Sequence, residues 1–199
     1  MRKIFLLSPA HSGGKRAQLI LNPRAAFPLA QRLHRKQPVE LGEIFTFLSG
    51  LYFRGKLAYA RAFAAPPAGL GPAYVITTNR GLLPVDQPIT LAELQAFSSV
   101  DIDGDDPRYR DPLLRMARTM ARAHPDCRVV LLGSISTGKY VDPLLDVFGD
   151  QLEFPAAFVG RGDMSRGGLM LRAVRALQEL EYIRVRGATR RGQRPPRLR

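Results

Sequence analysis

The sequence predicts an α/β domain built as a three-layer sandwich, with a mainly parallel central sheet of about four strands and flanking helices. Three observations support this fold class. Short apolar runs bounded by turn residues recur along the chain, and helical patterns separate them. The 199 residues are enough for one domain with a large core. The lone cysteine, Cys127, offers no intramolecular bridge, so the core must hold the fold together.

The predicted strands are continuous apolar stretches, as expected of strands covered on both faces. They lie at 4–7, 73–77, 129–132 and, with a weaker pattern, 152–154. The helical patterns occupy 25–35, 41–64, 111–123, 142–148 and 168–180. Asp111-Pro112 and Asp142-Pro143 are good helix starts, because aspartate caps free amides and proline is tolerated in the first turn. The stretch 81–89 is expected to be a loop or a linker.

Charge and composition bear on the domain limits and on the partners. The formal net charge is +13 and the isoelectric point is near 10.8, which favours nucleic acid, nucleotides or acidic surfaces as partners. We expect residues 1–183 to form the domain and residues 184–199 to be a basic, flexible tail, either a binding arm or a solubilising segment. The apolar run 4–7 is too short for a signal peptide, and no stretch could span a bilayer. The sequence therefore predicts a cytoplasmic protein without a membrane partner.

The loop after the third predicted strand resembles a phosphate-binding loop. It reads Gly-Ser-Ile-Ser-Thr-Gly-Lys-Tyr over residues 133–140. Ser136, Thr137 and Lys139 are placed as phosphate ligands, but Tyr140 stands where a magnesium-binding serine or threonine belongs. Backbone amides, a helix N-terminus and Lys139 would still attract an anion. The alternative is a tight turn with Lys139 in solvent.

The first predicted strand also runs into a glycine-lysine loop. His11, Lys15 and Arg16 lie in it or just after it. Because the carboxyl ends of parallel strands share one edge of a sheet, this loop and the loop of Lys139 are expected to face one ligand. His11 is then a candidate for proton transfer near neutral pH, or else a histidine in solvent.

The loop at 160–168 is the strongest candidate for an active loop. Arg161 and Arg166 can grip phosphate in a bidentate way, and Ser165 can donate to it. Asp163 lies between the arginines and is the candidate general base, while an internal Arg-Asp pair that only holds the loop is the alternative. Arg54, Lys56 and Arg61 are further phosphate-binding candidates. They interleave with Tyr52 and Tyr59, which are candidates for stacking on a base.

Metal and cofactor sites are not predicted. His11, His34 and His124 are scattered and have no zinc spacing. The acidic stretch 101–106 resembles a calcium loop, but its glycine comes at the fourth position and Pro112 stands where the twelfth-position glutamate belongs.

Two resemblances follow from these motifs. The stretch 51–61, with Leu-Tyr-Phe-Arg-Gly-Lys, and the stretch 81–89, with Gly-Leu-Leu-Pro, resemble an uncharacterised domain family of bacteria and phages over about the first ninety residues. The strand order and the turn at Ser165-Arg166-Gly167 are similar in outline to uracil-DNA-glycosylase-like domains. The water-activating loop and the histidine-proline-serine loop of that family are absent here, so this resemblance implies a related fold more than a shared mechanism.

Together these features predict a nucleic-acid-associated protein with a phosphate-binding site at the strand ends, acting on a base or an N-glycosidic bond as a glycosylase-like hydrolase. Two alternatives stay open: an enzyme that binds a nucleotide or a phosphosugar, and a noncatalytic nucleic-acid-binding module. The sequence does not indicate DNA or RNA, nor the oligomeric state.

Overall fold

The computed structural model describes residues 1–193 and 195 and contains one six-stranded sheet. The strand order is β3-β2-β1-β4-β5-β6. The strands are β1 Lys3–Leu7, β2 Ala73–Ile76, β3 Leu82–Pro84, β4 Arg128–Leu132, β5 Leu152–Pro155 and β6 Tyr182–Arg184. β2, β1, β4 and β5 run parallel, and β3 and β6 pair antiparallel at the two edges.

The α/β class is confirmed, but the prediction of about four mainly parallel strands is wrong, since the sheet is mixed. Both missed strands are three residues long. β3 lies in the segment that we expected to be a loop or a linker, and β6 overlaps the boundary between the predicted domain and tail. A three-residue strand is too short to show an alternating sequence pattern. It forms because it pairs with a buried neighbouring strand.

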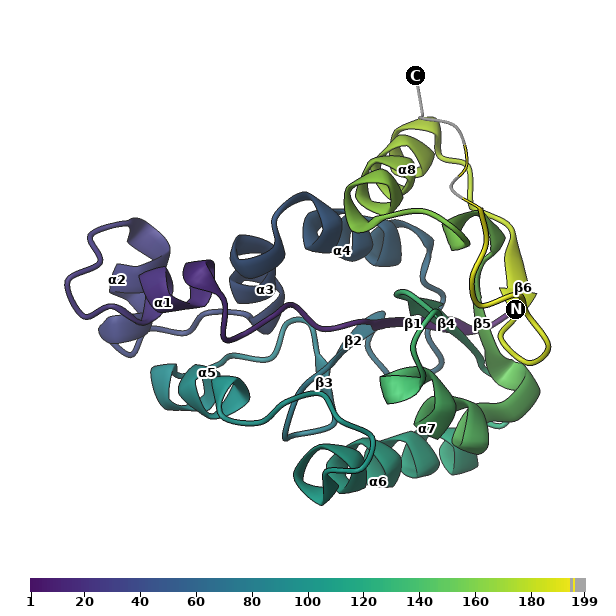
Figure 1. The fold of residues 1–199 in the computed structure, drawn as a ribbon, viewed down its shortest axis with the longest axis horizontal. Helices are drawn as coiled ribbons and strands as arrows, with labels where there is room; N and C mark the ends of the chain where they lie inside the picture. The colour runs from purple at the N-terminus through teal and green to yellow at the C-terminus, as the bar shows by residue number, and fades with distance from the viewer. Residues whose placement is uncertain (194, 196–199) are drawn as a thin grey trace.

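The centre of the sheet is apolar on both faces. Every residue of β1 and β2 is buried, and Phe5 pairs with Val130 in the middle of the sheet. Helices cover the two faces and make three layers (Figure 1). The first face carries α4 Leu51–Phe63 and α8 Asp163–Ala176, and the second carries α6 Pro107–Ala123 and α7 Gly138–Phe148.

The remaining helices are shorter. They are α1 Lys15–Leu21, α2 Pro28–His34, α3 Leu41–Ser49 and α5 Leu91–Ser98, with single 3-10 turns at Gly149–Gln151 and Ala156–Phe158. The sequence pattern missed α1 and α5. The start of α5 carried a signal, because Thr90 and Glu93 form a capping box.

Several predicted helix limits are wrong. The helix expected over 41–64 is broken at Gly50, where φ is +61°, a conformation that favours glycine, and the break separates α3 from α4. α6 begins at Pro107 after an Asp106 cap, and α7 and α8 also begin four or more residues earlier than expected. Pro112 and Pro143 therefore lie inside helices, not at their starts.

The described part of the C-terminal segment contacts the domain. Val185 is buried, Arg190 pairs with Asp142 at 2.6 Å, and Arg186 pairs with Asp150 at 3.3 Å. The flexibility expected of 184–199 stays a prediction, and residues 194 and 196–199 lie outside the described residues. In the part of the chain that the structure describes, no helix is long and apolar enough to cross a membrane.

Candidate functional site

The chain reverses its direction of winding between β1 and β4. After β1 it enters the helices that lead to α4 on the first face, and after β4 it enters α7 on the second face (Figure 1). β1 and β4 are neighbours in the sheet, so the loops that follow them diverge from one point. Ligands of open α/β sheets bind at such a switch point, outside the carboxyl ends of the strands.

A cleft of about 460 Å³ lies at this edge. It is formed by the loop after β1, the end of β2, the end of α5 and the start of α7. Its lining residues are Ala10, His11, Ser12, Gly13, Thr78, Phe97, Ser98, Val100, Asp101, Ile102, Asp103 and Lys139. The volume is within the range of small-ligand sites.

Hydrogen bonds to a single carbonyl hold the wall of the cleft. The Ser12 hydroxyl donates to the Phe97 carbonyl at 3.2 Å, and the Thr78 hydroxyl donates to the same oxygen at 2.8 Å. The loops after β1 and β2 are thereby tied to the end of α5. The charged groups of the lining, His11, Lys139 and the two aspartates, are exposed around this fixed wall.

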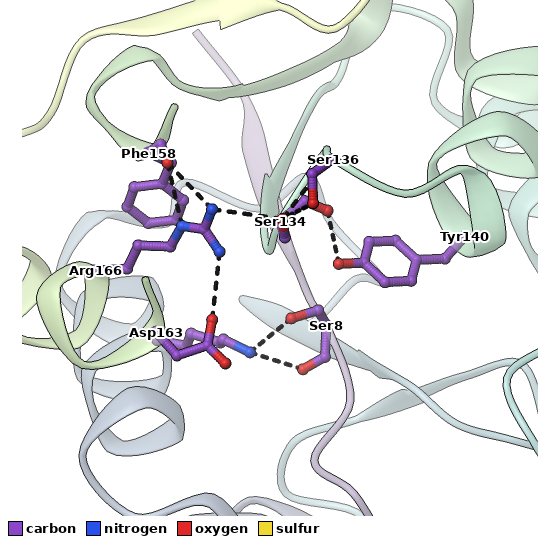
Figure 2. Close-up of polar contacts among 8 residues, drawn as sticks. Ser8, Ser134, Ser136, Tyr140, Phe158, Asp163 and Arg166 are labelled. Carbon is purple, nitrogen blue, oxygen red and sulfur yellow. Dashed lines mark hydrogen bonds and ion pairs between the residues drawn. The ribbon is translucent and has the colours of Figure 1, made fainter. Parts of the chain in front are cut away.

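A second feature of the same sheet edge is a buried polar cluster centred on Lys56, Ser8 and Arg166. The Lys56 ammonium is 1% exposed and donates to the Ser8 carbonyl at 2.9 Å and to the Ser8 hydroxyl at 2.7 Å. It also lies 3.8 Å from the centre of the Tyr52 ring. Figure 2 shows Ser8 on one side of this cluster and Asp163 and Arg166 on the other.

Arg166 closes the other side of this cluster. Its guanidinium donates twice to the Phe158 carbonyl at 3.2 Å, reaches the Ser134 hydroxyl at 3.4 Å and pairs with Asp163 at 3.3 Å (Figure 2). Arg166 is 7% exposed, whereas the Asp163 side chain is 66% exposed. The loop after β4 and the start of α8 are therefore joined through one arginine.

The loop after β4 is closed by its own side chains. The Tyr140 hydroxyl donates to the Ser134 carbonyl at 2.7 Å, and the Ser134 and Ser136 hydroxyls share a hydrogen bond of 2.8 Å. Gly133 lies against Ser8, since a Cβ atom there would come within 2.8 Å of the Ser8 Cβ. Only glycine therefore lets the ends of β1 and β4 approach so closely.

Close helix packing brings α4 and α8 together. A Cβ atom on Gly55 would lie 2.8 Å from the Gly167 carbonyl oxygen, and one on Gly167 would lie 2.9 Å from the Leu51 carbonyl oxygen. These two glycines allow the helix backbones to touch. The contact sets Lys56, one residue after Gly55, beside Arg166, one residue before Gly167.

Burial changes the pKa of the ionisable groups in the cluster. It lowers the pKa of Lys56 from 10.5 to about 7; the Asp163 carboxylate opposes this shift and the Arg166 charge adds to it. Burial also raises the pKa of Tyr140 and of Tyr52. The Tyr52 hydroxyl has no hydrogen-bond partner among the described residues. Strongly shifted groups of this kind gather at functional sites.

The structure brings some of the predicted site residues together and leaves others apart. His11 and Lys139 line the same cleft, in agreement with the expected convergence of the first two loops. Asp163 does not line that cleft, so the two catalytic candidates are not opposed across it. Arg161 donates to the Ala157 carbonyl at 2.8 Å and to the Ser165 hydroxyl at 3.3 Å. The internal Arg-Asp pair expected as the alternative is present between Arg166 and Asp163.

The other phosphate-binding candidates lie on the surface or at a helix start. Lys15, Arg16 and Arg54 are exposed, and Arg16 donates to the Phe47 carbonyl at 3.1 Å. Thr137 is the N-cap residue of α7 and its side chain makes no capping bond. The proposed stacking by Tyr52 is wrong, because this ring is buried against Lys56.

Sequence reasoning placed Lys56 among the phosphate-binding charges, whereas the structure buries it, and it left Asp101 and Asp103 outside the site. One signal for Lys56 was present, because it falls at helical spacing from Tyr52, Tyr59 and Ala60, all on the buried face of α4. The two aspartates carried no such signal, since an acidic turn is usually solvated.

Comparison with known proteins adds no relative to this picture: no family model, no curated protein and no solved structure matches the chain.

Proposed function

We propose that the protein associates with nucleic acid and receives a base or nucleoside in the cleft of His11, Phe97, Asp101, Asp103 and Lys139. The cleft itself is the observation that carries this proposal, because it combines small-ligand volume with the switch point of the sheet. The formal charge of +13 supports a polyanionic partner for the surface around it.

The charges of the cleft favour a base and a sugar over a phosphate. Asp101 and Asp103 line the cleft together with Lys139 and His11, so the lining has two carboxylates and one permanent cation. Carboxylates repel phosphate but accept hydrogen bonds from sugar hydroxyls and from exocyclic amino groups. Phosphates then lie outside the cleft, on exposed cations such as Lys15 and Arg16.

The reaction that this lining suits is hydrolysis of an N-glycosidic bond. The bond between the sugar C1′ and the base nitrogen breaks, water supplies a hydroxyl group to C1′, and the base leaves with a proton. His11 supplies that proton. One of the carboxylates of Asp101 and Asp103 accepts the proton that the attacking water gives up, and the other stabilises positive charge on the sugar.

Binding of a mononucleotide without a polymer is the alternative, and one observation favours it. The cleft volume of about 460 Å³ accommodates a single nucleoside, so base and sugar can bind there without a polymer while the one phosphate lies outside the cleft. Equal affinity for a mononucleotide and for an oligonucleotide that contains it would support this alternative.

The test measures binding of nucleosides by calorimetry and release of free base from oligonucleotides by chromatography. The variant His11→Gln/Asp101→Asn/Asp103→Asn is compared with His124→Gln/Asp126→Asn, whose side chains lie outside the cleft. Loss of hydrogen bonds to charged groups predicts affinity that is at least about tenfold weaker for the cleft variant, with the control unchanged. Absence of nucleoside binding by the native protein would overturn the proposal. Binding without release of free base would contradict hydrolysis of the N-glycosidic bond.

A further inference from the structure

The exposed face of α6 carries four arginines around a shallow groove. Arg110, Arg115, Arg118 and Arg122 line a hollow of about 400 Å³. Asp111, Leu114 and Thr119 complete its lining. We call these four residues the arginine face of α6. They span 13 residues of helix, or about 18 Å along its axis.

No ion pair or side-chain hydrogen bond holds these four guanidinium groups within residues 1–193 and 195. Arg108 on the same helix differs, because it pairs with Asp106 at 2.6 Å. Asp111 is the only acidic residue in the lining of the groove. The groove therefore carries positive charge that the described part of the protein does not neutralise.

Stability of the fold does not explain the arginine face. α6 packs on the domain through its opposite side, with Tyr109, Leu113 and Ala117 buried. Arg115 and Arg118 are three residues apart, and Arg118 and Arg122 are four apart, so like charges repel along the helix. Arg110 also lies in the first turns, where the helix dipole disfavours a cation. These arginines weaken the helix unless an anion neutralises them.

The arginine face continues to the cleft at the sheet edge. A neighbouring hollow is lined by Arg110 and Lys139 together with four aspartates, Asp103, Asp105, Asp142 and Asp146. This hollow shares Asp103 and Lys139 with the cleft and Arg110 with the groove. A strand lying on the arginine face thus reaches the mouth of the cleft across the start of α7, and its phosphates stay on the arginine side of the four aspartates.

We propose that the arginine face of α6 binds the phosphate backbone of the nucleic-acid strand whose base enters the cleft. This inference rests on the proposed function and names the surface that positions the polymer. Arg166, by contrast, is buried and bonded to the Phe158 carbonyl, so it takes no part in holding the backbone.

The chemistry of the face favours nucleic acid over a lipid surface. All the basic residues of α6 are arginines, whose planar guanidinium groups bind phosphate oxygens in a bidentate way. Membrane-surface helices need large apolar residues beside their cations. Among residues 1–193 and 195, the exposed large apolar residues are Met1, Leu19, Met164 and Leu177, none of which lies on α6.

The test measures anisotropy of a labelled single-stranded oligonucleotide with the full chain over a salt series. The variant Arg115→Gln/Arg118→Gln/Arg122→Gln is compared with Arg24→Gln/Arg35→Gln/Lys36→Gln, which removes the same charge from exposed positions outside the groove. Each lost phosphate contact lowers the slope of log K against log salt by about 0.7, so three contacts predict a slope smaller by about 2 for the α6 variant alone. Nucleoside affinity in the cleft should stay unchanged.

Each other outcome contradicts the inference in a distinguishable way. Equal losses in both variants would show that only net charge matters. Displacement of the oligonucleotide by polyglutamate at equal charge, or tighter binding to anionic vesicles, would assign the face to another partner. If the native protein binds nucleosides but no oligonucleotide, the proposed role of the arginine face is contradicted and the proposed role of the cleft is not. If the native protein binds neither nucleosides nor the oligonucleotide, the proposed function is contradicted as well.

Discussion

The Lys56 ammonium donates to both oxygen atoms of Ser8, at 2.9 Å to the carbonyl and at 2.7 Å to the hydroxyl. This contact joins the middle of α4 to the first residue after β1, 48 residues away in the sequence. Ser8 lies against Gly133 at the end of β4, so the lysine fixes the floor of the switch point. Its burial makes the geometry of the site depend on a group that titrates near neutral pH.

Lys56→Met should remove a pH dependence of stability. The folded pKa of about 7 lies below the ordinary value of 10.5, so the unfolded chain holds more protons between these values. The free energy of unfolding of the native protein therefore rises with pH above about 7, by up to about 1.4 kcal/mol per pH unit from this group. Urea unfolding followed by circular dichroism at pH 7 to 9.5 measures the slope for both proteins.

That pH window excludes the buried tyrosines, which titrate higher and act with the opposite sign. A native protein and a Lys56→Met variant with parallel profiles would show that Lys56 keeps its proton throughout the window.

Asp163→Asn should move the same profile without unfolding the protein. The Asp163 carboxylate raises the pKa of Lys56, so its removal lowers that pKa further and the rise in stability begins at lower pH. Since the Asp163 side chain is 66% exposed, its ion pair with Arg166 contributes about 1 kcal/mol or less. Asp150→Asn, which breaks exposed pairs with Arg184 and Arg186, is the control and should leave the onset unchanged. An unchanged onset in both variants would contradict the coupling.

Gly55→Ala and Gly167→Ala should each destabilise the protein by about 1–3 kcal/mol. The new methyl group meets helix backbone at 2.8 or 2.9 Å, and backbone cannot turn away as a side chain can. Gly168→Ala is the matched control on the same helix, because its nearest neighbour is the end of Arg172 at 3.7 Å. Helix propensity predicts a neutral or stabilising effect of up to about 1 kcal/mol there. Equal chemical unfolding midpoints for all three variants would show that α4 and α8 are not in backbone contact.

Tyr109→Phe and Tyr59→Phe should differ in their effect on stability. The Tyr109 hydroxyl is buried without a partner among the described residues, so its removal is neutral or stabilising by about 1 kcal/mol. The Tyr59 hydroxyl lies 2.6 Å from the Tyr182 hydroxyl and accepts from the Leu180 amide at 2.8 Å. Its removal costs about 1–2 kcal/mol because both partners lose a bond. Thermal unfolding compares the pair, and a large loss in Tyr109→Phe would reveal a partner for that hydroxyl.

Local pattern predicted the core of the sheet well. The stretches 4–7, 129–132 and 152–154 are strands, because a run of apolar residues between turn residues has few other ways to be buried. The pattern failed at β3 and β6, whose pairing partners were unknown from sequence, and at the helix starts, where prolines inside α6 and α7 were mistaken for first-turn residues.

The candidate site was predicted only where it follows the strands directly. His11 comes from the loop after β1 and Lys139 from the first turn of α7, and the shared edge of a parallel sheet implied that they would converge. Phe97, Asp101 and Asp103 come from α5 and the loop after it, whose position depends on how the chain crosses the sheet.

The sequence by itself determined the α/β class, the apolar central strands and the glycine-rich loops at their ends, since these depend on neighbouring residues and on local burial. Tertiary structure alone decided that β4 lies beside β1, that Gly55 touches Gly167 and that Lys56 is enclosed over Ser8. Those relationships join residues more than forty positions apart, and the free energy that selects them comes from packing the whole sheet and its helices, which no single segment encodes.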